Sequence, residues 1–504
     1  MRFTPHPFGA PAGGLLAACA LAAAVSTGAA AQASRGALAR GTFAVTHVSV
    51  IPMTGDTVIS DATVLVRDGR IAAVGPAARV RVPAGTRQID GRGRFLVPGL
   101  ADMHTHLFSD DSTMAADSVA PYELGVMVAN GVTATRLMIG TPEQLALRTA
   151  VREGRVLGPQ LWVASPQLAG RPFDNGRVVT TPEQAREVVR EVAAAGYDFV
   201  KLTLFITPPV YDAIMDEAAR RGIRVVGHVE TAIGVPRALA AGQPIEHLDA
   251  YFEAVLADSA PSRASVTQYG VFRLDNWRSL DHVDNRKIAQ IAGLTARAPG
   301  WGKWTSPTLN VFNDAFAIGP AEEEIRARPE WNLLPPKFRE TYMGARPRYW
   351  SAAAAEVRTE ARRRRYVEVR NGLVKAIADS GGRVLAGSDT PEWFHLYGFG
   401  LHRELAALVG AGLTPYQALE AATRNPAEFL GAAAEWGTIE PGKRADLVLL
   451  AANPLRDIRN TTRIEGVSLG GRWMDRAALD GMIRAAGQRL NPSAGSAAPS
   501  GGAP

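Results

Sequence analysis

Short apolar runs alternate with longer amphipathic stretches through the middle of the chain, over residues 96–435. Strands that alternate with helix-length segments are typical of parallel βα units. The runs of strand length fall at residues 95–101, 132–138, 161–164, 199–204, 223–226, 244–246, 305–311 and 384–386. Eight parallel strands with intervening helices predict an α/β fold, a TIM-type (β/α)8 barrel.

A different pattern flanks this region at both ends of the chain. Residues 41–95 contain short alternating or apolar runs separated by turn-forming segments, and residues 436–480 contain more such runs. This pattern predicts antiparallel β units. We therefore expect the two ends to form a second, smaller discontinuous β-sandwich domain around the inserted barrel. Residues 490–504, rich in Ser, Ala, Gly and Pro, are expected to be a disordered tail.

Two further segments depart from the alternation of strands and helices. Residues 312–350, between the seventh and eighth strands, are rich in Pro, Arg, Glu and aromatic residues. The segment is too long for a simple connection, so we expect a lid or a substrate loop. Residues 361–365 (ARRRR) lie in a stretch of helical character, which favours a solvated helix face over a binding patch.

Composition limits the class of protein. The 504 residues are 46% hydrophobic and 21% charged, which is ordinary for a globular chain. The net charge of +6 comes from basic residues spread among acidic ones, so no nucleic-acid partner is expected. No segment after the N-terminal region has the ~18 uninterrupted apolar residues that cross a bilayer. We expect a small-molecule partner, and the chain leaves homo-oligomerisation open.

The N-terminus has the pattern of a targeting segment. Arg2 precedes an Ala- and Leu-rich stretch that ends in small residues, which predicts a removable signal peptide at residues 1–33 and a periplasmic or secreted protein. Residues 16–19 (LAAC) also fit a lipoprotein signal, which would make Cys19 a lipid-anchored N-terminus. Because Cys19 is the only cysteine, no intrachain disulfide is possible, and any metal site must use His and carboxylates.

Polar residues fall at or near the carboxyl ends of five predicted strands, where TIM barrels place their chemistry. His104 and His106 follow the first strand, and a spacing of two points both imidazoles to the same face of an extended chain. The residues from the fourth, fifth, sixth and eighth strands are Lys201, His228, His247 and Asp389. Each alone could be structural, but together they predict a metal site.

With these residues in place, the sequence resembles the amidohydrolase superfamily from about residue 44 to about residue 474. Further shared motifs are residues 68–71 (DGRI), 97–99 (VPG), 412–415 (GLTP), 421–423 (AAT) and 442–448 (GKRADLV). The imidazolonepropionase-like and Xaa-Pro dipeptidase-like groups are the most similar. One departure is Arg136-Leu137, where many relatives carry an Arg-Asp pair after the second strand.

The resemblance implies a binuclear metal centre with a carboxylated lysine. His104, His106 and Asp389 would hold the more buried ion, His228 and His247 the more exposed one, and carboxylated Lys201 would bridge them. A protonated lysine would repel two dications, whereas a carbamate neutralises and bridges them. Zinc is the default metal for nitrogen and oxygen ligands, and manganese, iron or cobalt would also fit.

This centre suggests a hydrolase. Two divalent ions lower the pKa of a shared water toward neutrality. Asp389 is the candidate catalytic residue, which would accept the proton and deliver it to a leaving nitrogen. The hypothesis is hydrolysis of a carbon-nitrogen bond in a linear amide, a dipeptide or a cyclic amide. Ester, lactone or phosphoester hydrolysis is one alternative, and a non-catalytic barrel scaffold is another.

Other polar residues beyond the predicted strands could contact a substrate. The candidates are Arg171, Tyr251 and His395, which follow the third, sixth and eighth strands. His402 lies on the helix predicted after the last strand, and we expect a structural or supporting role for it.

Overall fold

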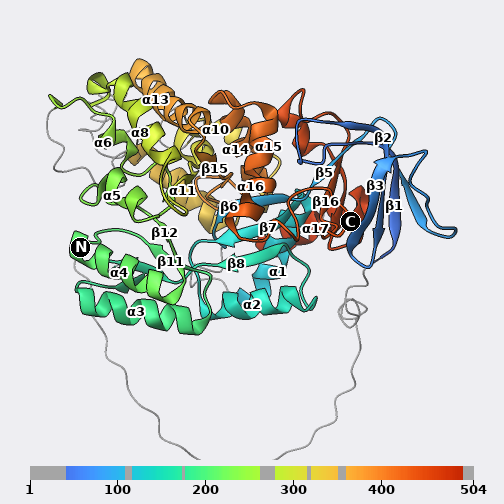
Figure 1. The fold of residues 1–504 in the computed structure, drawn as a ribbon, viewed down its shortest axis with the longest axis horizontal. Coiled ribbons are helices and arrows are strands. Elements are labelled where there is room, and N and C mark those ends of the chain that lie inside the picture. The colour runs from blue at the N-terminus through green and yellow to red at the C-terminus, as the bar shows by residue number, and fades with distance from the viewer. Residues whose placement is uncertain are drawn as a thin grey trace, which may run out of the picture. The chain divides into compact units, whose positions relative to one another are not determined.

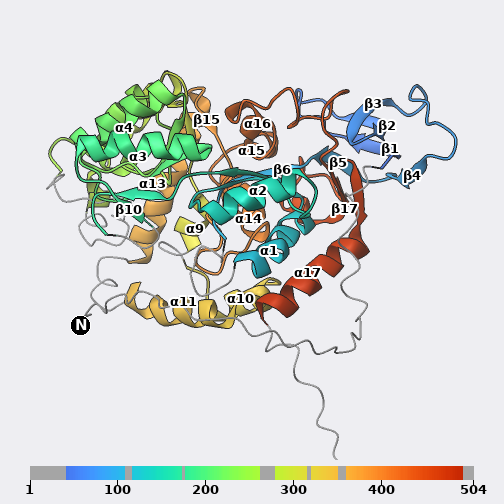
Figure 2. The same ribbon diagram turned by 90° about the horizontal axis from the view of Figure 1, so that it is seen from below.

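The computed structural model describes residues 41–107, 116–172, 176–260, 279–314, 319–349 and 359–491. These residues belong to one compact unit of mixed α and β structure (Figures 1 and 2). The predicted signal peptide, Cys19 and residues 492–504 of the predicted tail lie outside the described residues. Leu490 is buried at the end of α17 (Arg476–Leu490), so the tail boundary predicted at residue 490 is too early. No helix among the described residues is long and apolar enough to cross a membrane.

Strands from both ends of the chain pair in one eight-stranded sheet. The strands are β1 (Phe43–Val50), β2 (Ile59–Arg67), β3 (Arg70–Pro76), β4 (Arg87–Asp90), β5 (Phe95–Pro98), β16 (Leu447–Leu450), β17 (Ile464–Leu469) and β18 (Arg472–Asp475). Their order is β18-β17-β16-β5-β1-β2-β3, and β4 pairs with β1. Antiparallel pairs such as Leu96 with Leu449 join β5 to β16 and so bring the two ends together.

This sheet differs from the expected β-sandwich domain in two respects. Its hydrogen bonds form one continuous sheet, not two packed sheets, because β5 and β16 pair directly. It also belongs to the same compact unit as the rest of the described chain. Its buried core is apolar, with Val45, Val64 and Leu447 among its members. The alternation of apolar residues at both chain ends predicts this shared face, but not whether one sheet or two would form.

Eight parallel strands follow one another in the middle of the chain, near the predicted positions. They are β6 (Leu100–Thr105), β7 (Val132–Leu137), β8 (Gln160–Val163), β11 (Phe199–Leu202), β12 (Arg224–Gly227), β13 (Ile245–Glu246), β14 (Trp304–Ser306) and β15 (Arg383–Val384). They pair as β6-β7-β8, as β11-β12 and as β13-β14-β15. Two short strands, β9 (Gln167–Ala169) and β10 (Gly176–Val178), extend the β11-β12 ladder.

Single contacts link these ladders to one another. A parallel bridge between Ala164 and Phe199 connects β8 to β11. The amide of Met103 in β6 donates a 2.9 Å hydrogen bond to the carbonyl of Ala386, just after β15. Among the described residues, β12 and β13 share no ladder. The strand order is therefore that of the predicted barrel, while its closure stays a prediction.

Two predicted strands have different boundaries in the structure. Residues 95–101 divide between β5 of the antiparallel sheet and β6 of the parallel set. The chain passes between the two at Gly99, where a Cβ atom would lie 2.1 Å from the Thr133 hydroxyl oxygen. The predicted strand at residues 305–311 ends at Ser306. Thr308 has a φ of 44°, and this left-handed residue precedes the short helix α9 (Leu309–Phe312).

Helices follow most of the parallel strands. They are α1 (Ala116–Ala129), α2 (Pro142–Arg152), α3 (Pro182–Ala195), α4 (Pro208–Arg221), α5 (Gly234–Ala240), α6 (Tyr251–Ala254), α8 (Asn285–Ala296), α13 (Glu360–Asp379), α14 (Phe399–Gly410), α15 (Pro415–Ala421) and α16 (Arg424–Phe429). The 3-10 helices are η3 (Leu280–His282), η5 (Trp331–Leu333) and η6 (Ile458–Thr462). Thr181 caps α3 with a capping box, and Gly196 in a left-handed conformation ends it.

The predicted lid or substrate loop is largely helical where it is described. It begins at the last residue of α9 and contains α10 (Glu322–Arg326), η5 and α11 (Pro336–Tyr349), of which Figure 2 labels α10 and α11. The helix η5 contacts α17. The arginine run lies on α13, where Arg364 is exposed and pairs with Glu360 one turn away. This pairing agrees with a solvated helix face.

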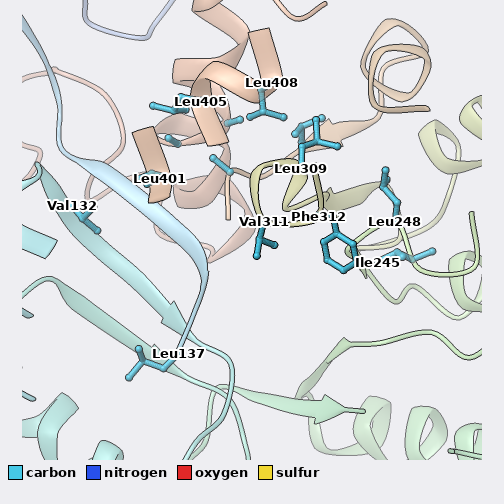
Figure 3. Close-up of a cluster of buried hydrophobic side chains, with 14 of the residues drawn as sticks. Val132, Leu137, Ile245, Leu248, Leu309, Val311, Phe312, Leu401, Leu405 and Leu408 are labelled. Carbon is cyan, nitrogen blue, oxygen red and sulfur yellow. The ribbon is translucent and has the colours of Figure 1, made fainter. Parts of the chain in front are cut away.

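An apolar cluster joins α14, the helix after Asp389, to the short helix α9. Leu401, Leu405 and Leu408 project from one face of α14, because residues four and three apart share a helix face. They lie near Leu309 at the start of α9 (Figure 3). The helix α9, which follows β14, therefore packs against α14, which follows β15.

Candidate metal centre

Three of the predicted ligands form a compact group at the ends of β6 and β15. His104 lies within β6, His106 follows it, and Asp389 follows β15. Nε2 of His106 is 3.2 Å from Oδ1 of Asp389, and Nε2 of His104 is 3.4 Å from the same oxygen. One donor atom of each residue lies within 4.8 Å of the others. Two imidazoles and a carboxylate at this separation are a donor set that suits zinc and related ions.

The remaining imidazoles adjoin this group. The ring centroid of His247 is 4.5 Å from that of His104 and 4.7 Å from that of His228. Nδ1 of His247 is 3.8 Å from Oδ2 of Asp389. Lys201 is buried on β11, where its charge interacts with that of Asp389. The structure thus places the six predicted ligand residues on neighbouring strand ends.

Burial sets the protonation of these groups. It holds the pKa values of His104, His228 and His247 well below the usual value, so the rings are neutral and each has a lone pair for a metal. Burial also lowers the pKa of Lys201 to about 8, against the opposing effect of nearby carboxylates. Burial tends to raise the pKa of Asp389, but its contacts with the neighbouring imidazoles, including the hydrogen bond with His106, hold that pKa well below the usual value. The protein therefore presents neutral imidazoles and an ionised carboxylate, which are the forms that bind divalent ions.

Two glycines let the strands approach closely at this point. A Cβ atom on Gly227 would lie 2.3 Å from the carbonyl oxygen of Leu202 and 2.8 Å from Cδ of Lys201. One on Gly387 would lie 2.8 Å from Cβ of His104. Glycine is required at both positions because any side chain would collide with a ligand residue or its strand.

The backbone is also strained at two of the predicted ligand residues. His247 has a φ of 58° and Asp389 a φ of 55°, in the left-handed region that residues other than glycine rarely adopt. Strain of this kind costs of order 1–3 kcal/mol and persists where packing imposes it, often at functional sites. Both residues end their strand segments by turning sharply, which aims their side chains at the group around His104.

Three of the imidazoles have a hydrogen-bond partner at Nδ1, and sequence reasoning missed all three partners. Nδ1 of His104 is 2.9 Å from Oε2 of Glu246, and Nδ1 of His228 is 2.8 Å from Oδ2 of Asp249. Nδ1 of His247 is 2.8 Å from the hydroxyl of Thr308. Such partners orient metal-binding imidazoles and fix their tautomers. The acidic residues at 246 and 249, on either side of His247, were the available sequence signal.

Asp102 ties β6 to the segment that carries Asp389. Its carboxylate accepts hydrogen bonds from the amide and hydroxyl of Ser388, at 2.9 Å and 2.5 Å, and from the amide of His104 at 3.3 Å. Burial raises the pKa of Asp102 to about 7, although these hydrogen bonds act in the opposite direction. Its spacing of two from His104 on a buried strand was a sequence signal for this supporting role.

The three predicted substrate contacts differ in accessibility. Arg171 is exposed after β9, and its guanidinium carbon lies 3.3 Å from the ring centroid of Phe205. Tyr251 is fully buried, and its hydroxyl forms a 2.7 Å hydrogen bond with the hydroxyl of Thr295 in α8. His395 is also fully buried. Arg171 is thus the exposed member of the set, and contact of Tyr251 and His395 with a substrate stays a prediction.

Comparison with known proteins complements this geometry. The model of the amidohydrolase family matches residues 95–263 and 354–474, more than half of the chain. The chain belongs to the amidohydrolase family. Residues 264–353 of this amidohydrolase, which contain α10 and α11, lie between the two matched segments.

Curated relatives are similar over most of this amidohydrolase. Imidazolonepropionase from Porphyromonas gingivalis is 26% identical over 419 residues, which cover 78% of this chain and 84% of that protein. Adenine deaminase 3 from Rhizobium meliloti is 24% identical over 398 residues, which cover 78% of this chain and 52% of that protein. The chain thus spans about half the length of the second relative.

Solved structures of TIM-barrel type share the fold. A structure assigned as a prolidase, from Bifidobacterium longum, has a TM-score of 0.63 and 27% identity, and covers 89% of this chain and 99% of that chain. Bottromycin amidohydrolase has a TM-score of 0.69 and 24% identity, and covers 90% and 92% of the respective chains. The second likeness concerns the fold alone.

Proposed function

We propose that this amidohydrolase is a metal-dependent enzyme that hydrolyses a carbon-nitrogen bond in a linear amide, a dipeptide or a cyclic amide. The observation that carries the proposal is the group of His104, His106 and Asp389, in which one donor atom of each residue lies within 4.8 Å of the others. The names of two relatives, imidazolonepropionase and prolidase, support the same class of reaction.

The proposed cofactor is a pair of divalent ions, with zinc as the default. His104, His106 and Asp389 would hold one ion and His228 and His247 the other, and carboxylated Lys201 would bridge them. Burial supports carboxylation, because a lysine whose pKa is lowered to about 8 offers more neutral amine to react with carbon dioxide than an exposed one. When bound, such ions lower the pKa of water and polarise a carbonyl group.

The chain's own residues would then move the proton. The Asp389 carboxylate lies beside the imidazoles of His104 and His106 and is ionised at neutral pH, so it can accept a proton from an attacking water. The same carboxyl group can deliver that proton to the departing nitrogen. The Asp102–Ser388 hydrogen bonds restrain the segment that carries it.

Arg171 is the proposed anchor for the substrate. Stacking on Phe205 restrains its guanidinium, which can form two parallel hydrogen bonds to a carboxylate. Arg171 follows β9, which pairs with the strand of Lys201, so it lies on the same side of the sheet ends as the proposed metals. We therefore favour substrates with a free carboxylate, such as dipeptides and N-acyl amino acids.

From sequence alone we also propose export to the periplasm or medium.

A side-by-side substrate panel tests this function. Metal-replete full-length protein is assayed with dipeptides, N-acyl amino acids and cyclic amides, and in parallel with esters, lactones and phosphoesters. We expect turnover of the carbon-nitrogen substrates, with Arg171→Met raising KM for those that carry a carboxylate and leaving KM for neutral amides unchanged. Faster turnover of the oxygen esters would contradict the proposed bond class, and no turnover in a metal-loaded protein would favour a scaffold.

A further inference from the structure

A buried ion pair lies behind His104, on the side away from Asp389. Nη2 of Arg136 in β7 is 2.7 Å from Oε1 of Glu246 in β13. The other carboxylate oxygen of Glu246 is 2.9 Å from Nδ1 of His104. The side chains of Arg136 and Glu246 are 0% and 1% exposed. A chain of hydrogen bonds therefore runs from the interior of the parallel strands to the proposed metal centre.

The chemistry of this chain fixes the state of the imidazole. A carboxylate that is paired with an arginine accepts hydrogen bonds and does not donate them, so Nδ1 of His104 carries the proton that it shares with Glu246. Its other nitrogen, Nε2, then has a lone pair directed toward Asp389. Arg136 completes the arrangement by balancing the charge of Glu246.

Arg136 also restrains the backbone beside His104. Its Nε donates a 2.6 Å hydrogen bond to the carbonyl of Met103, the residue that precedes His104. Its guanidinium carbon lies 5.7 Å and 5.4 Å from the ring centroids of Phe199 and Phe429. One arginine thus restrains both the main chain and, through Glu246, the ring of the same residue.

The free energy of unfolding does not by itself explain this ion pair. Removing two charges from water costs several kcal/mol per ion, and apolar residues of similar volume are often as stable. Because this ion pair contributes little net stability and contacts the imidazole of His104, we assign it a role in positioning that imidazole.

We infer that Arg136 and Glu246 are positioning residues that fix the tautomer and orientation of His104 and so set the affinity of the more buried metal position. The inference rests on the metal centre proposed above, but not on which bond the enzyme cleaves.

The test measures metal affinity without an assay of activity. The apparent Kd for Zn²⁺ of the full-length protein is obtained by competition with a chromophoric chelator, and the visible spectrum of the Co²⁺-loaded protein reports ligand geometry. For Glu246→Gln we expect Zn²⁺ binding weakened about 10–100-fold and a changed Co²⁺ spectrum. For Arg136→Lys, which keeps the charge but loses the two-point contact, we expect a smaller weakening in the same direction.

Glu330→Gln is the matched control. Glu330 is as buried as Glu246 and pairs with an arginine, Arg403, away from the ligands. We expect wild-type Zn²⁺ affinity and an unchanged Co²⁺ spectrum, even if the variant is less stable. Glu246→Asp, which keeps the charge and shortens the side chain, gives the same readout if Glu246→Gln does not fold.

Three results would overturn the inference, and they can be told apart. Glu246 variants that bind Zn²⁺ as tightly as wild type, with the wild-type Co²⁺ spectrum, would remove the positioning role and leave the metal centre intact. Wild-type protein that binds no Zn²⁺ would remove the metal centre itself. An equal weakening by Glu330→Gln would assign the effect to general loss of stability, against the inference.

Discussion

The eight-stranded sheet and the parallel strands are both buried, but they bury different chemistry. The interior of the sheet is an apolar cluster that includes Val45, Val64 and Leu447. The parallel strands bury Lys201, Arg136 and Glu246 with the imidazoles around them. Burying charge costs free energy unless it is paired. The eight-stranded sheet therefore contributes mainly to stability, whereas the parallel strands bury charged groups that reduce stability and lie at the proposed metal centre.

The largest effect is expected where the parallel strands end, at Asp389. Asp389→Asn removes the carboxylate that would accept and return the proton, so kcat for a carbon-nitrogen substrate should fall about 10²–10⁴-fold. Steady-state kinetics with the best substrate of the panel measures this loss.

Asp198→Asn is its matched control. Asp198 pairs with Arg148 at 2.6 Å and precedes β11, at the opposite end of the strand that carries Lys201. Its substitution should leave kcat within a few-fold of wild type. An equal loss of kcat in Asp389→Asn and Asp198→Asn would contradict the assignment of catalysis to the carboxyl ends of the strands.

A substitution in the core of the eight-stranded sheet should lower the free energy of unfolding and leave metal binding unchanged. Leu447→Ala creates a cavity in a fully buried apolar region, so the free energy of unfolding should decrease by about 2–5 kcal/mol. The Zn²⁺ affinity of the folded variant should equal that of wild type. Chemical denaturation and chelator competition measure the two quantities, and a large loss of Zn²⁺ affinity would show that the two regions are coupled.

A buried histidine outside the metal centre sharpens the comparison further. His402 on α14 is hydrogen bonded to the hydroxyl of Thr461 at 3.0 Å and lies 3.1 Å from the carbonyl of Asn130. Burial lowers its pKa to about 4, so its ring is neutral in the fold and becomes charged more readily in the unfolded chain. These contacts agree with the structural role expected from sequence.

The pH dependence of stability follows from that lowered pKa. Below pH 6.5 the unfolded chain takes up a proton at His402 that the folded protein does not, so stability decreases as pH falls toward about 4. The slope from this residue is about 1.4 kcal/mol per pH unit. His402→Gln should remove it, which denaturation of metal-free protein at several pH values would measure. Parallel curves for variant and wild type would contradict the lowered pKa.

Sequence reasoning succeeded where local pattern determines structure. The parallel strands occur near the predicted positions, and the residues proposed as ligands lie at their ends, because a short apolar run followed by a polar residue is a local feature. His106, His228 and Asp389 are examples.

It failed where the outcome depends on contacts distant in sequence. Glu246 hydrogen bonds to His104, 142 residues away, and nothing in the strand of either residue specifies the pairing. The change of sheet at Gly99 depends on its contact with Thr133, and the turn at Thr308 ends a run that has strand composition. The hydrogen bond of Tyr251 to Thr295 in α8 likewise joins residues 44 positions apart.

The most direct test of the account is the metal dependence of hydrolysis. Full-length protein is purified without chelator, its metal content is determined by elemental analysis, and activity is followed through removal and restoration of the metal. The account predicts two divalent ions per chain, loss of carbon-nitrogen hydrolysis on removal and recovery on addition of Zn²⁺. Hydrolysis that persists at full rate in protein shown to be free of metal would contradict it.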